Sequence, residues 1–164
     1  PLPEAQLDRF LMRISLGYPS QTDEIAIMDR QQMHHPVEEL QPVVSAPDVL
    51  RLQAAVKEIY VDPLVKQYIV GITSATRSHD AVYLGASPRG SLALYRAAQA
   101  RALLSDRDFV LPDDIKATAS ATLAHRIIVK PAARVRDITA ERIVNDVLNT
   151  LPVPGARARG AAIR

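Results

Sequence analysis

The sequence predicts a mainly α-helical protein, in which a bundle of about four helices follows an N-terminal segment with a short strand and helix. Two observations support this fold class. After residue 45, apolar residues recur three and four positions apart, as on one face of a helix. The candidate helices in this region begin at capping residues or prolines, whereas strand-like segments are short and few.

The first part of the chain is expected to hold a short helix or turn, a strand, a helix and a linker. Residues 4–10 form the helix or turn, and apolar residues alternate along 10–16 as they do in a strand. A break at Gly17-Tyr18-Pro19-Ser20 ends this strand, and a helix follows from Thr22. Segment 34–47 contains three prolines and is the best candidate for a linker.

Two helices are expected between residues 45 and 80, each with a recognisable start. Ser45 and Asp48 form a capping box around Pro47, and Asp62 caps the helix that Pro63 opens. The predicted buried stripes are Leu52, Val56 and Ile59 in the first helix, and Val65, Ile69 and Ile72 in the second.

The remaining helices follow the same logic. A short extended segment at 81–86 leads into a helix that starts at Ser87-Pro88 and ends near Leu104. Pro112 opens the next helix, where Asp113 and Asp114 complement the helix dipole. Residues 126–130 have a strand-like composition, and residues 139–151 are expected to form the last amphipathic helix. The tail that follows, at 152–164, is expected to be disordered. The predicted stripe of the helix after Ser87 is Leu92, Tyr95, Ala98 and Ala102.

Composition narrows the class of protein. The 164 residues are 48% hydrophobic and 23% charged, as in soluble globular domains, and no apolar run approaches the ~20 residues of a membrane span. The lack of cysteine excludes a disulfide scaffold and a thiolate metal site. Residues 1–50 carry three basic and eight acidic side chains, whereas 51–164 carry seventeen and ten. This bias suits head-to-tail association or an anionic ligand, although a solvated face explains it equally simply.

Few patterns indicate catalysis. The P-loop motif G-x-x-x-x-G-K-[ST] is absent, so these residues are not expected to cradle a triphosphate in that manner. His34 and His35 are adjacent and face different directions, and no metal site is predicted. Helix-terminus electrostatics explain both the Asp113-Asp114 pair and His125-Arg126.

Two arginines remain as candidate anion ligands. Arg89 follows Ser87 and Pro88 at the start of a helix, where backbone N–H groups and the dipole favour an anion and disfavour a cation. A phosphate sharing this site would make the guanidinium favourable, because Arg–phosphate hydrogen bonds are charge-assisted. Arg9 lies just before the expected strand and could project from a sheet edge. The alternative for Arg89 is a solvated residue or a local ion pair.

Three stretches resemble the MoxR family of AAA+ ATPases. The first stretch, "PLPEAQLDRFLMRISLGYPS" (1–20), is similar to the family's arginine-finger segment. The other two, "YIVGITSATR" (68–77) and "LGASPRGSLALYRAAQARALLSDRDFVLPDDIKATASATLAHRI" (84–127), are similar to its lid domain. Within the last stretch, "GASPR" matches the sensor 2 motif. The resemblance implies a helical-bundle AAA+ lid domain preceded by a strand and helix remnant of the α/β AAA+ core. The implied parts are the end of the core at 1–33, a linker at 34–47, the lid at 48–151 and a basic tail at 152–164.

The resemblance also implies roles for individual residues. Arg9 matches the arginine finger, which reaches the γ-phosphate of a neighbouring subunit's ATP. Arg89 matches the sensor 2 arginine, and whether it contacts its own or a neighbour's nucleotide stays open. Ser87 and Pro88 position the helix start that aims Arg89, and Asp8 is expected to be a structural partner at the interface. Leu111 departs from the family pattern, because Thr or Ser would normally cap the helix there.

The implied function is that of an oligomeric ATPase that remodels or matures protein complexes, including metal-cofactor insertion. A homo-oligomeric ring, expected to be a hexamer, would hydrolyse ATP in the cytoplasm with a von Willebrand factor A-domain protein as partner. ATP and Mg²⁺ would be bound mainly by a part upstream of Pro1, so the 164 residues alone are predicted to be inactive. The alternatives are a stand-alone scaffold domain and a non-enzymatic helical module that binds nucleic acid or a partner protein. Scattered basic residues without interleaved aromatics argue against nucleic acid.

Overall fold

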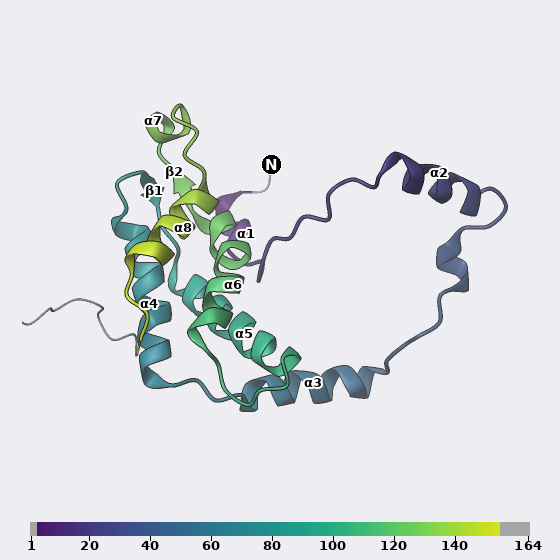
Figure 1. Cartoon of the computed structure of the whole chain (residues 1–164), viewed down its shortest axis with the longest axis horizontal. Coiled ribbons are helices and arrows are strands. Elements are labelled where there is room, and N and C mark those ends of the chain that lie inside the picture. The colour runs from purple at the N-terminus through teal and green to yellow at the C-terminus, as the bar shows by residue number, and fades with distance from the viewer. Residues whose placement is uncertain (1–2, 155–164) are drawn as a thin grey trace, which may run out of the picture. The chain divides into compact units, whose positions relative to one another are not determined.

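The computed structural model describes residues 3–154 and is mainly helical, as the sequence predicts (Figure 1). The chain divides into two compact units, one made of the residues up to Arg13 and from Ala54 onward, the other of Ile14–Gln53. The domain boundaries expected from the sequence stay a prediction, and the tail from residue 155 lies outside the described residues.

The elements are α1 (Glu4–Leu7), α2 (Gln21–Arg30), η1 (Pro36–Glu39), α3 (Ala46–Glu58), α4 (Pro63–Ser78), β1 (Val82–Leu84), α5 (Pro88–Leu104), α6 (Pro112–Leu123), η2 (Ala124–Arg126), β2 (Ile128–Val129), α7 (Pro131–Arg134) and α8 (Ala140–Thr150).

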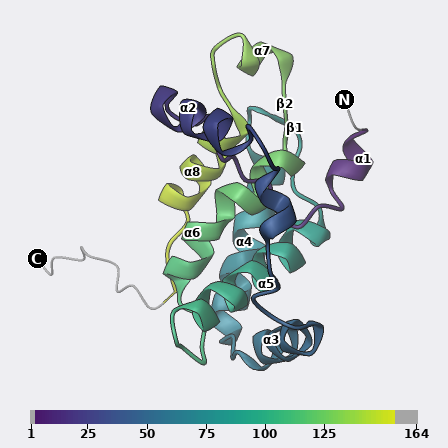
Figure 2. The ribbon, with the colours of Figure 1, turned by 90° about the vertical axis from the view of Figure 1, so that its right-hand side faces the viewer.

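The larger unit gathers α4, α5, α6 and α8 around one hydrophobic core, with the hairpin of β1 and β2 at one end and α7 beyond it (Figure 2). β1 pairs antiparallel with β2, so that Val82 lies opposite Val129. The largest fully buried apolar side chains come from all four helices: Ile72, Leu94, Ile115, Leu123, Ile143 and Val144. The hairpin confirms the extended segments expected at 81–86 and 126–130.

Helix starts follow the local sequence. The Asp62 carboxylate accepts a hydrogen bond from the Leu64 N–H at 2.7 Å, and the Ser87 hydroxyl accepts one from the Arg89 N–H at 3.2 Å. The Ser45 N–H donates to Asp48 at 2.8 Å, which confirms the predicted capping box. These bonds satisfy N–H groups that have no partner inside the helix.

Two of the residues that the helical periodicity assigns to buried stripes are exposed in the structure. Leu92 of α5 is 66% exposed, and the neighbouring Leu94 is fully buried instead. Leu52 of α3 is also exposed, although Ile59, directly after that helix, is buried. Alanines recur along α5 at positions 93, 97, 98, 100 and 102, so the apolar pattern contrasts weakly between the two faces of the helix.

The strand expected at residues 10–16 is not formed, and that prediction is wrong. The segment is irregular and its residues are exposed. A strand requires a neighbouring strand for its backbone hydrogen bonds. Here the Arg13 N–H instead donates to the Ala121 carbonyl of α6, at 2.8 Å. The helix expected from Thr22 is confirmed as α2, and η1 falls within the expected linker.

Candidate functional site

The two arginines selected from the sequence line the same surface hollow. Its volume is about 430 Å³, and its walls come from the segment after α1, from α5 and from the end of η2. Arg9 and Arg89 belong to segments far apart in the sequence, and the fold brings them to one place. The lining residues are Asp8, Arg9, Leu11, Arg89, Leu92, Ala93, Arg96 and Arg126.

The hollow carries an excess of positive charge. Four arginines line it against one carboxylate, that of Asp8. Arg89 and Arg96 are seven residues apart on α5, two helical turns, and so share one face of the helix. Arg96 donates to the Gln99 side chain at 2.9 Å, and it was not selected from the sequence. Its spacing from Arg89 is the signal that could have identified it.

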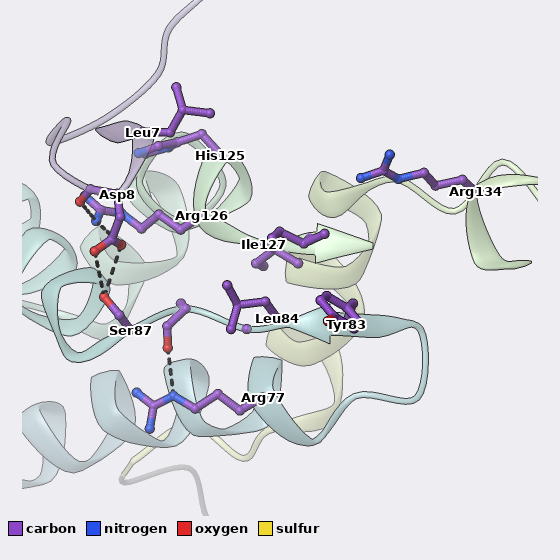
Figure 3. Close-up of a pocket in the computed structure, with 13 residues that line it drawn as sticks. Leu7, Asp8, Arg77, Tyr83, Leu84, Ser87, His125, Arg126, Ile127 and Arg134 are labelled. Carbon is purple, nitrogen blue, oxygen red and sulfur yellow. Dashed lines mark hydrogen bonds and ion pairs between the residues drawn. The ribbon is translucent and has the colours of Figure 1, made fainter. Parts of the chain in front are cut away.

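Asp8 connects the segment after α1 to the start of α5. Its carboxylate oxygens accept hydrogen bonds from the Ser87 hydroxyl at 3.1 and 3.0 Å (Figure 3). The same carboxylate lies 3.6 Å from Nε of Arg89 and 2.9 Å from Nη1 of Arg126. These contacts link the helix cap of α5 to the residue next to Arg9.

Arg126 is the most deeply buried charged group of the site, with a side chain only 2% exposed. Its Nε donates to the Thr122 carbonyl at 2.8 Å. Its Nη1 donates to the Asp8 carbonyl and its Nη2 to the Phe10 carbonyl. The helix dipole, by which the sequence alone accounts for Arg126, therefore explains only part of its environment. No local pattern distinguishes an arginine with such distant partners from one at an ordinary helix end.

His125 adds a second contact to the same segment. Its Nε2 lies 3.2 Å from the Phe10 carbonyl oxygen, while its buried Nδ1 has no hydrogen-bond partner within residues 3–154. Burial lowers the pKa of His125, and the neighbouring positive charge of Arg126 acts in the same direction. The imidazole is therefore neutral near pH 7.

A second cavity, of about 780 Å³, lies between the Asp8–Arg126 contact and the β1–β2 hairpin (Figure 3). Arg77 and Arg134 line it together with mostly apolar side chains such as Tyr83 and Leu84. Arg77 Nε donates to the Ala86 carbonyl at 2.7 Å. This contact requires glycine at position 85, because a Cβ there would lie 2.6 Å from the Arg77 Cα.

Neither a metal-binding cluster nor a membrane-spanning helix is found among the described residues. Among the side chains that the structure describes, no three His, Cys, Asp or Glu residues are grouped so that they could hold a metal ion. None of the helices within residues 3–154 is both long and apolar enough to span a bilayer.

Comparison with known proteins identifies the class. Residues 74–147 match the AAA lid domain family. The chain is 48% identical over 158 residues to the uncharacterized protein YeaC of Bacillus subtilis, covering 96% of this chain and 49% of that protein. It is 36% identical over 167 residues to the chaperone MoxR1 of Mycobacterium tuberculosis, covering 96% and 44%. A crystal structure from Cytophaga hutchinsonii, described as a "putative ATPase", matches with a TM-score of 0.83 at 33% identity, over 93% of this chain and 49% of that one.

The fold and the matched residues thus define the lid-bearing region of an AAA+ ATPase, which confirms the fold class expected from the sequence. Within that class, the chain matches proteins named MoxR or chaperone MoxR along more than 90% of its length, in agreement with the resemblance seen in its sequence. It spans about half the length of the curated relatives it matches.

Proposed function

We propose that this chain is the C-terminal part of a MoxR-type ATPase, in which Arg9 and Arg89 bind the phosphates of ATP at a subunit interface. The observation that carries the proposal is the hollow that these two arginines share with Arg96. The exposed guanidinium groups of Arg9, Arg89 and Arg96 around one hollow suit a polyanion, because they can form charge-assisted hydrogen bonds to phosphate oxygens.

Each residue has a distinct proposed role. Arg9 acts as the arginine finger and neutralises charge in the transition state of phosphoryl transfer. Arg89 acts as sensor 2, and Ser87 and Pro88 hold the helix start from which it projects. Because Arg9 and Arg89 line one hollow, they contact the same nucleotide. If Arg9 reaches across the interface, that nucleotide belongs to the neighbouring subunit, and Arg89 also acts in trans.

The wider function follows from the family. One relative is named a chaperone, which supports chaperone-like remodelling or maturation of protein complexes, with metal-cofactor insertion as one form. The proposed assembly is a cytoplasmic homo-oligomeric ring, a hexamer, that works with a von Willebrand factor A-domain protein. ATP and Mg²⁺ would be held mainly by Walker motifs outside these 164 residues, which by themselves would not hydrolyse ATP.

The first experiment is to read the coding sequence upstream of Pro1 and express the whole protein. With oligomeric state unchanged, Arg9→Ala and Arg89→Ala are each expected to lower kcat for ATP hydrolysis about a hundredfold or more. Arg136→Ala is the matched control, since this exposed arginine lies outside the hollow. An Arg9→Ala protein that hydrolyses ATP at the wild-type rate would contradict the proposed function.

Mixed rings test whether Arg89 acts in trans. Subunits with Arg89→Ala and an intact ATP site are combined with subunits that cannot bind ATP but retain Arg89. Action in trans predicts that mixing restores hydrolysis, because an intact Arg89 then faces an intact ATP site. If Arg89 served its own subunit's nucleotide, mixing would restore nothing.

A further inference from the structure

We infer that Arg126 is a positioning residue for Arg9, and that it acts by holding the backbone on both sides of it. The inference rests on the proposed function of Arg9 and extends it to a residue of the lid. Arg126 itself is buried, so it acts through Arg9 and not by touching a nucleotide.

The hydrogen bonds of Arg126 bracket Arg9. Nη1 donates to the carbonyl of Asp8, and Nη2 donates to the carbonyl of Phe10, the residues immediately before and after Arg9. A weaker contact at 3.4 Å joins Nη2 to the Leu11 carbonyl. Because a guanidinium is planar and rigid, bonds to both carbonyls fix the orientation of the backbone at Arg9.

The other end of Arg126 is anchored in the helical bundle. Nε donates to the Thr122 carbonyl of α6 at 2.8 Å, and Thr122 is itself buried. Nη1 also lies 2.9 Å from the Asp8 carboxylate, which accepts from the Ser87 hydroxyl at the start of α5. One connected set of bonds therefore joins the backbone of Arg9 to the cap of the helix that carries Arg89.

Few other contacts order the segment that carries Arg9, and the main one is the bond from the Arg13 N–H to the Ala121 carbonyl at 2.8 Å. α1 has only four residues, too few to be stable by itself, and no strand pairs with residues 8–11 in the described structure. The Arg9 N–H donates to the Gln6 carbonyl at 3.0 Å, which is a bond within the segment. The position of Arg9 relative to Arg89 therefore depends on the contacts of Arg126, Asp8 and His125, together with the Arg13 bond four residues further on.

Trypsin cleavage between Arg9 and Phe10 measures this restraint without any nucleotide. Arg126→Met keeps an unbranched side chain but removes the hydrogen bonds, and is expected to speed this cleavage by about tenfold or more. Cleavage after Arg30, in the other unit, should not change and serves as the internal control. Arg136→Met is the matched variant. An unchanged cleavage rate at Arg9 would overturn the inference.

Arg126→Lys covers the case in which Arg126→Met fails to fold. Lysine keeps the charge and the buried stem, but a single ammonium cannot reproduce the planar pair of bonds to two carbonyls. The same acceleration of cleavage at Arg9 is expected in a variant whose melting curve remains cooperative. A folded Arg126→Lys protein with wild-type cleavage would count against the inference.

A double-mutant cycle in the whole protein separates positioning from general stabilisation. Arg126→Lys is expected to lower kcat by about tenfold to a hundredfold with little change in the KM for ATP. In an Arg9→Ala background, the same change should lower kcat no further, because its effect passes through Arg9. Equal losses in both backgrounds would refute positioning. Wild-type activity of Arg9→Ala alone would instead refute the proposed function.

Discussion

Asp114 is predicted to be the carboxylate on which the stability of this bundle depends most, and Asp114→Asn tests this. Asp114 is 3% exposed, and its oxygens accept from Nη1 and Nη2 of Arg107 at 2.8 and 2.7 Å. It also accepts from the Leu111 N–H at 2.9 Å, which supplies the helix cap that the Leu111 side chain cannot. α6 begins here and leads into η2, which carries Arg126, so this anchor also supports the candidate site.

The expected loss is about 3 kcal/mol in the free energy of unfolding. Breaking a buried ion pair costs about 3–5 kcal/mol, since the remaining partner is left without its counter-charge. The lower end applies because the Arg107 side chain is 23% exposed and can regain water. For a domain of this size, that loss lowers the Tm by about 6–12 °C.

Urea unfolding and thermal melting followed by circular dichroism measure the loss. Asp113→Asn is the matched control, because Asp113 occupies the same first turn of α6 but is exposed. The control should cost no more than about 1 kcal/mol, the worth of a carboxylate near a helix N-terminus. If Asp114→Asn cost no more than Asp113→Asn, the buried ion pair would not be the stabilising element.

The pH dependence of Asp114 supplies a further check. Burial alone raises its pKa, but the Arg107 hydrogen bonds, the Leu111 N–H and the charges of Arg107 and Arg101 together lower it below the ordinary 3.8. A pKa lower in the folded state means that the carboxylate stabilises the fold above the unfolded pKa. This stabilisation is lost as the pH falls through the folded pKa. The difference between wild type and Asp114→Asn should therefore shrink below about pH 4.

Three further predictions concern packing and titration. Leu94→Ala should cost about 2–5 kcal/mol in urea unfolding, because Leu94 is fully buried, whereas Leu92→Ala on the same helix should cost about 0.5 kcal/mol or less. Gly85→Ala should lower the Tm, because the added Cβ collides with the backbone of Arg77 at 2.6 Å; a Tm equal to that of wild type would exclude this close contact. The pKa of His125 is lower in the folded state than its ordinary value of 6.5. As the pH falls through 6.5, the unfolded state therefore binds a proton at His125 before the folded state does. The free energy of unfolding should decrease as a result. His125→Gln should lack this part of the decrease when urea unfolding is compared at about pH 7.5 and about pH 5.5.

Most helix starts could be predicted from the sequence because capping bonds join residues close in the chain. Asp62 bonds to the N–H two residues on, and Ser87 does the same at the start of α5. The strand expected at 10–16 could not be judged in this way, because a strand exists only through a distant partner. The buried face of α5 was equally inaccessible, since its many alanines suit either side.

The sequence by itself indicated the family resemblance, the helical class, the caps and the two candidate arginines, because all of these depend on short contiguous patterns. Only the tertiary structure decided that Arg9 and Arg89 line one hollow with Arg96. It also decided that Arg126 and Asp8, 118 residues apart in the sequence, form the contact that joins η2 to the segment after α1. The physical reason is that a buried guanidinium must find acceptors wherever the fold provides them. Here all the acceptors except the Asp8 carboxylate are backbone carbonyls, which every residue carries and no sequence pattern reveals.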